Sequence, residues 1–132
     1  MLQVERRTLP GESDGCGALE AQEILRQLRA EDPELDADVR EVFSRSPYEI
    51  DASSQLPGMM VQAAEAAGGR PRVTGFSFWS DTAILGSAGI PAVLFGPGGA
   101  GLHSTEEYVR VEEVLRCRDA LAALARVFTR AS

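Results

Sequence analysis

Apolar residues recur at helical spacing in four segments of the chain. They return at intervals of three and four residues, and many of the positions between them hold charged or amide side chains. The predicted helices are residues 18–30, 57–67, 82–86 and 111–128. Pro57 suits the first turn of the second helix, and Ser80 with Asp81 is expected to cap the third.

Segments before and between these helices are predicted to form β-strands. They are short, rich in branched and aromatic residues, and bounded by turn residues. The predicted strands are residues 2–9, 38–45, 71–76 and 91–95. The last of these is apolar at successive positions, which is typical of a strand covered on both faces in a parallel sheet between helices. The order of helices and strands predicts an α/β fold.

A glycine-rich loop follows the last predicted strand and leads to His103, the single histidine of the chain. Glycines let the backbone turn sharply and approach a ligand closely, and open α/β sheets bind ligands at the carboxyl ends of their strands. The serine, threonine and glutamates after His103 offer oxygens that could orient an imidazole bound to a metal. A lone histidine is more often a structural or surface residue, and that alternative stays open.

Two other chemistries share residues with this loop. Residues 96–101 match the G-x-G-x-x-G pattern of dinucleotide-binding sites, but no helix is expected directly after the third glycine. Ser80, Asp81 and His103 have the residue types of a catalytic triad, but the G-x-S-x-G turn of such hydrolases is absent around Ser77. Both interpretations are weaker than a metal site.

Residues 89–107 resemble the C-terminal metal-site segment of a zinc-dependent amidohydrolase and metallopeptidase family. They read G-I-P-A-V-x-F-G-P-G, then four further residues, His103, and a glutamate, Glu107, four positions after the histidine. The family includes acetylornithine deacetylase, succinyl-diaminopimelate desuccinylase and bacterial glutamate carboxypeptidase. The Phe-Trp pair that ends at Trp79 resembles the acetylornithine deacetylase branch most, in which this position lines the substrate pocket.

Residues 5–12 carry the resemblance into a second part of the chain. They are similar to the D/E-x-R-x-x-P-G-E segment of the family's lid, or dimerisation, domain, in which the arginine matching Arg7 faces the substrate carboxylate. A guanidinium can hold a carboxylate through two hydrogen bonds. From the residues alone, Arg7 could equally be a solvated charge, and Trp79 a core aromatic beside a helix cap.

The resemblance implies that residues 1–50 are the second half of a small α+β lid domain. Residues 51–132 would be the C-terminal part of a three-layer α/β/α catalytic domain with two zinc ions, for which cobalt or manganese can substitute. The substrate would be a small N-acylated amino acid or peptide, and the lid sheet would form a homodimer. His103 would bind one zinc, Glu107 would support its loop, and Gly98 and Gly99 would lie against the substrate.

The other ligands of the family come from an N-terminal part that this sequence does not contain. A catalytic zinc needs about three protein ligands, so one histidine cannot hold it, and we expect no catalysis from this chain alone. The alternative is a non-catalytic dimerisation or interaction module derived from the family.

The composition of the chain excludes some classes of binding partner. The chain has 132 residues and a net charge of −7, and it has no lysine, which argues against binding to nucleic acid. No apolar run approaches the roughly 20 residues of a membrane span, and no secretory leader is evident, so no membrane contact and a cytoplasmic location are expected. Cys16 and Cys117 lack the spacing of a redox or metal motif.

Overall fold

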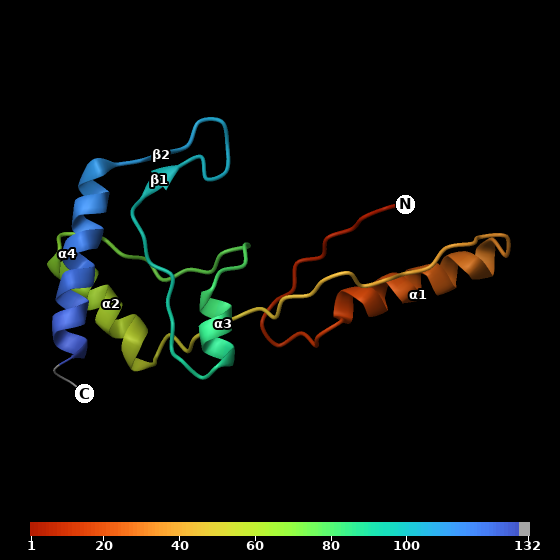
Figure 1. Cartoon of the computed structure of the whole chain (residues 1–132), viewed down its shortest axis with the longest axis horizontal. Coiled ribbons are helices and arrows are strands. Elements are labelled where there is room, and N and C mark those ends of the chain that lie inside the picture. Colours follow the sequence, from red (N-terminus) through yellow and green to blue (C-terminus); the bar gives the residue numbers. More distant parts are fainter. Residues whose placement is uncertain (130–132) are drawn as a thin grey trace. The chain divides into compact units, whose positions relative to one another are not determined.

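The computed structural model describes residues 1–129 and contains four α-helices within them (Figure 1). They are α1 (Cys16–Glu31), α2 (Gln55–Ala66), α3 (Thr82–Ser87) and α4 (Val111–Phe128). Each lies where the sequence predicts a helix, so these predictions are confirmed. One antiparallel pair of two-residue strands, β1 (Gly99–Ala100) and β2 (Tyr108–Val109), is also present and was not predicted. None of the described helices is long and apolar enough to cross a membrane.

The chain divides into two compact units. Unit 1 contains Met1–Glu49 together with Ser77–Trp79, and unit 2 contains Ile50–Phe76 and the chain from Ser80 onward. The division after Glu49 lies beside the domain boundary expected after residue 50. The assignment of the two parts to a lid and a catalytic domain stays a prediction.

Unit 1 is built on α1, which is flanked by extended chain. Alanine, leucine, glutamate, glutamine and arginine make up most of α1, and these residues favour the helix intrinsically. Residues 2–9 and 38–45 form no β-ladder, so the strand predictions there were wrong. A strand is defined by hydrogen bonds to a neighbouring strand, and no such neighbour pairs with these segments among residues 1–129.

Arg6 ties the start of α1 to the turn before it. Its Nη1 lies 2.5 Å from an oxygen of Glu12, and its Nη2 lies 2.8 Å from an oxygen of Glu20. The Leu9 backbone N–H also donates to the Glu12 carboxylate over 2.6 Å. The Arg6 side chain first, and the Leu9 N–H second, lower the pKa of Glu12 to about 2. Glu12 is therefore ionised at neutral pH and stabilises the turn before α1 through its contacts with Arg6 and Leu9.

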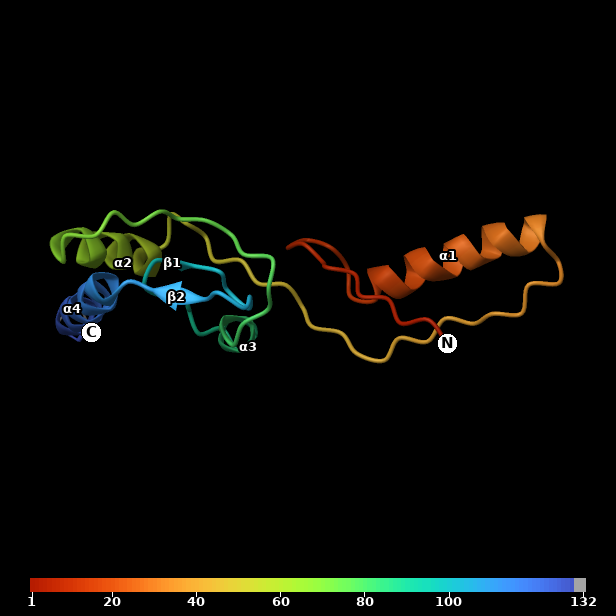
Figure 2. The ribbon, with the colours of Figure 1, turned by 90° about the horizontal axis from the view of Figure 1, so that it is seen from above.

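Unit 2 is built around the contact between α2 and α4, which lie side by side in both views (Figures 1 and 2). Its buried cluster is small, because most of its members are alanines. The cluster consists of Met60, Ala63, Ala64 and Ala120. The short side chains leave room for the two helices to approach closely, and they bury little apolar area per residue.

Residues 91–95 pack against this cluster without forming a strand. Ala92 is buried, and Val93 and Phe95 are partly buried against the α2 and α4 cluster, while Leu94 is 50% exposed. The prediction of a strand covered on both faces was therefore wrong, since residues 91–95 pair with no other strand among residues 1–129 and Leu94 is exposed. Residues 71–76 are also extended and unpaired, so no sheet between helices is present within residues 1–129.

The cap predicted for α3 is absent. Asp81 occupies the capping position, but its side chain makes no capping hydrogen bond. Its backbone has helical angles, φ −61° and ψ −14°, whereas a capping residue normally has an extended backbone that aims its side chain at the first free N–H groups. Ser80 Oγ instead pairs with Thr82 Oγ1.

Candidate functional site

A small β-hairpin holds the loop with His103. Gly99 pairs with Val109, and Ala100 pairs with Tyr108. The Arg110 backbone N–H donates to the Gly98 carbonyl over 3.3 Å, and this hydrogen bond extends the contact between the two hairpin strands by one residue. The hairpin belongs to unit 2. The sequence had predicted an open loop after a buried strand, whereas the structure has a hairpin at this place.

Two glycines are required by the hairpin itself. A Cβ atom on Gly99 would lie only 2.1 Å from the Tyr108 carbonyl oxygen. Gly101 has φ +75°, a conformation that residues with side chains rarely adopt. Gly98 lies against Arg110, whose Nη2 would be 3.0 Å from an added Cβ atom. The structure thus places Gly98 and Gly99 beside the chain's own residues, and their contact with substrate stays a prediction.

His103 lies exposed in the loop between the hairpin strands. Its φ of 60° makes it the non-glycine residue with positive φ in the described chain, a conformation that histidine tolerates better than most residues. The His103 backbone N–H donates to Glu107 Oε2 over 3.3 Å. Glu107 therefore contacts the main chain at His103, which suits a role in supporting the loop.

The described residues do not complete a metal site. No group of three or more histidine, cysteine, aspartate or glutamate side chains that could hold a metal ion occurs within residues 1–129. A catalytic zinc needs about three protein ligands. The donor set of the described chain therefore does not fit a catalytic metal by itself, and His103 could contribute one nitrogen ligand at most.

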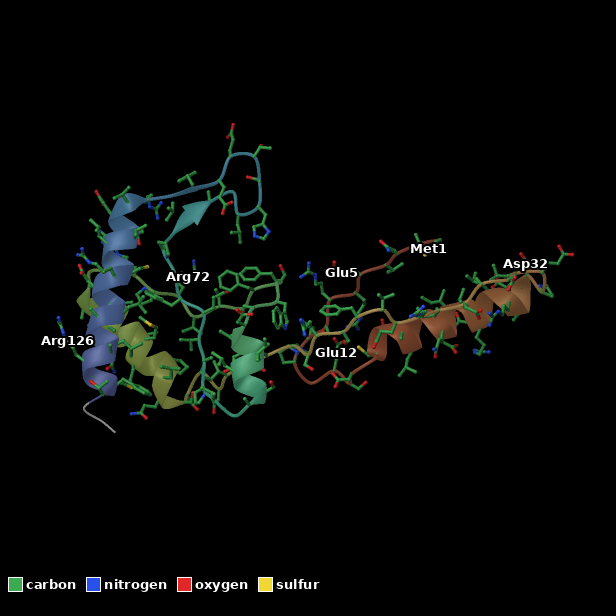
Figure 3. All side chains as sticks on the ribbon, in the orientation of Figure 1. Met1, Glu5, Glu12, Asp32, Arg72 and Arg126 are labelled. Atoms are coloured by element: carbon green, nitrogen blue, oxygen red, sulfur yellow. The ribbon has the colours of Figure 1, made fainter. Side chains whose placement is uncertain are left out.

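Arg7 lies in unit 1 and contacts the bend at Ser77–Trp79. Its Nη1 donates to the Ser77 carbonyl over 2.8 Å, and its Nε lies 2.6 Å from Glu5 Oε1 (Glu5 is labelled in Figure 3). The Arg7 side chain is 63% exposed. Two predicted substrate-binding residues, Arg7 and Trp79, thus lie at one bend of unit 1, whereas the others lie in unit 2.

The sequence analysis missed Arg45. Its guanidinium carbon lies 4.6 Å from the centre of the Phe43 ring and 4.8 Å from the centre of the Trp79 ring. Both distances are typical of cation–π contacts. Phe43 and Arg45 are two residues apart on extended chain and so share a face, which the sequence could have indicated. The contact with the distant Trp79 had no signal in the sequence.

A groove of about 220 Å³ lies between α2 and α4 and is lined by side chains of these two helices. None of the predicted site residues lines it. Its lining is mostly apolar, and it offers no cluster of groups for acid, base or metal chemistry.

Comparison with known proteins identifies the family. Residues 4–127 match the family described as peptidase family M20/M25/M40, and the chain belongs to this family of metal-dependent hydrolases. This confirms the resemblance seen in the sequence. No solved structure is significantly similar.

Curated relatives match the chain over most of its length. An acetylornithine deacetylase of Myxococcus xanthus is 31% identical over 120 residues, which cover 90% of this chain and 30% of the relative. A putative [LysW]-lysine/[LysW]-ornithine hydrolase of Pyrococcus horikoshii is 36% identical over 60% of this chain and 25% of the relative. A putative succinyl-diaminopimelate desuccinylase DapE of Mycobacterium tuberculosis is 36% identical over 63% and 25%. The chain therefore spans between 25% and 30% of the length of these relatives.

Proposed function

We propose that the chain is the C-terminal part of a di-zinc amide hydrolase that acts on N-acylated amino acids or small peptides. The family match across residues 4–127 carries this proposal. The relatives are named as a deacetylase, a hydrolase and a desuccinylase, and these names support a hydrolytic reaction on an acylated amino acid. The share of each relative that the chain covers supports the assignment to one part of such an enzyme.

His103 supplies one metal ligand in this proposal. The hairpin β1–β2 and the Glu107 contact fix the backbone at His103, while its side chain is exposed. A nitrogen ligand on a closed loop can keep its place when further ligands are supplied from elsewhere. Zinc, when bound, would polarise the amide carbonyl and activate water; cobalt or manganese could take its place.

Arg7 binds the substrate carboxylate. Its contacts to Glu5 and to the Ser77 carbonyl use Nε and Nη1, which leaves Nη2 for an incoming carboxylate. These contacts also hold the guanidinium in one orientation, so less freedom is lost when a ligand binds. Gly98, Gly99 and Trp79 would complete the substrate contacts.

The chain alone should not hydrolyse an amide, because it lacks the other ligands. Zinc titration by calorimetry together with an assay on N-acetyl-ornithine tests this. We expect zinc binding weaker than micromolar, loss of that binding in His103→Ala, and no turnover. Tight zinc binding with enzyme-like turnover by this chain would contradict the proposal. His103→Ala is a clean variant because the chain has a single histidine.

A non-catalytic dimerisation or interaction module is the alternative. Exposed apolar side chains on the extended segments favour it, since Val4 is 80% exposed and Val42 is 87% exposed. In either case we propose that the protein forms a homodimer through unit 1. We also propose a cytoplasmic location, because free thiols such as those of Cys16 and Cys117 persist in a reducing compartment. Light scattering that gives the mass of a monomer at all concentrations would exclude the dimer.

A further inference from the structure

Arg45 differs from the other arginines near it in what it contacts. Arg6, Arg7, Arg26 and Arg29 each pair with a carboxylate of unit 1. Within residues 1–129, Arg45 makes neither a hydrogen bond nor an ion pair, and its contacts of note are the Phe43 and Trp79 rings. Arg45 is therefore an arginine of unit 1 whose guanidinium lies against two aromatic rings and forms no ion pair within residues 1–129.

The two ring contacts of Arg45 do not use its N–H groups as hydrogen-bond donors. Cation–π contacts use the flat faces of the guanidinium, whereas its N–H groups point outward in the plane. The N–H fork of Arg45 therefore remains available to an anion while the guanidinium contacts the rings of Phe43 and Trp79. A planar anion with two oxygens, such as a carboxylate, matches this fork through paired hydrogen bonds.

A second guanidinium contacts the same bend. Arg7 donates to the carbonyl of Ser77, and Arg45 lies against the ring of Trp79. Ser77 and Trp79 are two residues apart, so their Cα atoms lie within about 7 Å of each other. Both belong to unit 1 together with the two arginines. Glu5 offsets part of the charge of Arg7, while no carboxylate of the described chain offsets that of Arg45.

We propose that Arg45, in contact with the rings of Phe43 and Trp79, is a second carboxylate-binding residue of unit 1. Together with Arg7 it makes this bend a site for small acylated amino acids or peptides that carry two carboxylates. This deepens the proposed function and rests on it only for the role of Arg7. Trp79 then serves as a wall that orients Arg45 and touches the ligand beside it.

A pair of ligands that differ by one carboxylate tests the proposal. N-acetyl-glutamate and N-acetyl-glutamine are titrated into the metal-free chain in the presence of a chelator, with NMR signals of the Trp79 indole N–H and the Arg45 Nε–H as the readout. Trp79 is the single tryptophan, so its signal is unambiguous. We expect both signals to shift with N-acetyl-glutamate, and N-acetyl-glutamine to bind about tenfold more weakly.

Variants assign the effect to a residue. Arg45→Gln should weaken N-acetyl-glutamate about tenfold and bring it close to N-acetyl-glutamine, and Arg45→Lys should restore only part of the loss because it lacks the fork. Arg40→Gln is the matched control, since Arg40 is exposed, lies in unit 1 and carries the same charge. Arg40→Gln should leave the affinities for both ligands unchanged. Circular dichroism should show the same helix content in every variant, which would confirm that α1 is intact.

The outcomes separate this proposal from the role of Arg7. If Arg7→Gln weakens both ligands and Arg45→Gln weakens neither, the second site is overturned and the role of Arg7 stands. If neither variant weakens either ligand, both carboxylate assignments are overturned. If the two ligands bind equally, the second site alone is overturned, because both ligands carry the α-carboxylate assigned to Arg7. An Arg45 Nε–H signal that does not shift with N-acetyl-glutamate in the unmodified chain would overturn the second site without any variant.

Discussion

Adjacent residues of similar type have different surroundings in this chain. Arg6 pairs with two glutamates that fix the start of α1, whereas Arg7 contacts a single glutamate and a backbone carbonyl and stays largely exposed. The sequence motif assigns the two arginines different roles only through its resemblance to a family, and the substrate-binding role of Arg7 stays a prediction. The partners of Arg6 could be expected from the nearby acidic residues, while the approach of Ser77 and Trp79 to unit 1 depends on tertiary structure.

The Glu12 carboxylate should make unit 1 sensitive to acid. Its pKa is lowered from 4.5 to about 2, so its stabilising contribution is complete above pH 4.5 and is lost as the pH falls toward about 2. An NMR titration of the Glu12 carboxyl carbon should show this low midpoint. Arg6→Gln should move the midpoint upward, and added salt should weaken the effect because the pair is exposed. An unchanged midpoint in Arg6→Gln would contradict the assignment of the cause.

Gly99 should tolerate no side chain. A Cβ atom at this position would lie 2.1 Å from the Tyr108 carbonyl oxygen, so Gly99→Ala must open the β1–β2 pair, at a cost of about 2 kcal/mol. Gly96→Ala is the matched control, since nothing lies within 4 Å of a Cβ atom there. Nuclear Overhauser contacts between residues 99 and 109 should vanish in the first variant and persist in the second. Persistence in both would show that the hairpin does not need this glycine.

Helices and strands of this chain were predictable to different degrees. Helical spacing is a local property of the sequence, so all four helices were found near their true bounds. A strand exists only when another strand pairs with it, and residues 2–9, 38–45, 71–76 and 91–95 have no such partner in the described part of the chain. The hairpin was missed because its pairing rests on glycines that also fit an open loop.

The α2–α4 contact should depend on the small size of Ala120. Ala120 is 1% exposed and lies in the buried cluster with Met60 and Ala64. Ala120→Leu should force the helices apart and lower the free energy of unfolding by about 2 kcal/mol. Ala122→Leu, at an exposed position of the same helix, should change it little. Denaturation followed by circular dichroism measures both, and equal effects would contradict the packing described.

At the scale of the whole molecule, the described chain buries few large side chains. The buried hydrophobic residues within residues 1–129 are Met60, Ala63, Ala64, Ala92 and Ala120, while residues such as Phe76 and Ile90 are more than half exposed. The chain also has a single histidine, and no cluster of three possible metal ligands occurs within residues 1–129. These features are expected if the chain contributes one part to a larger hydrolase of its family.

The intact mass of the protein that carries this sequence, isolated from the cells that make it, tests the account most directly. We predict a species several-fold heavier than 14.2 kDa, in line with relatives of which this chain covers 30% or less. Such a species should bind zinc tightly and lose that binding when His103 is changed to alanine. A native protein of 14.2 kDa, with no partner that supplies further ligands, would contradict the proposal and leave the interaction module as the function.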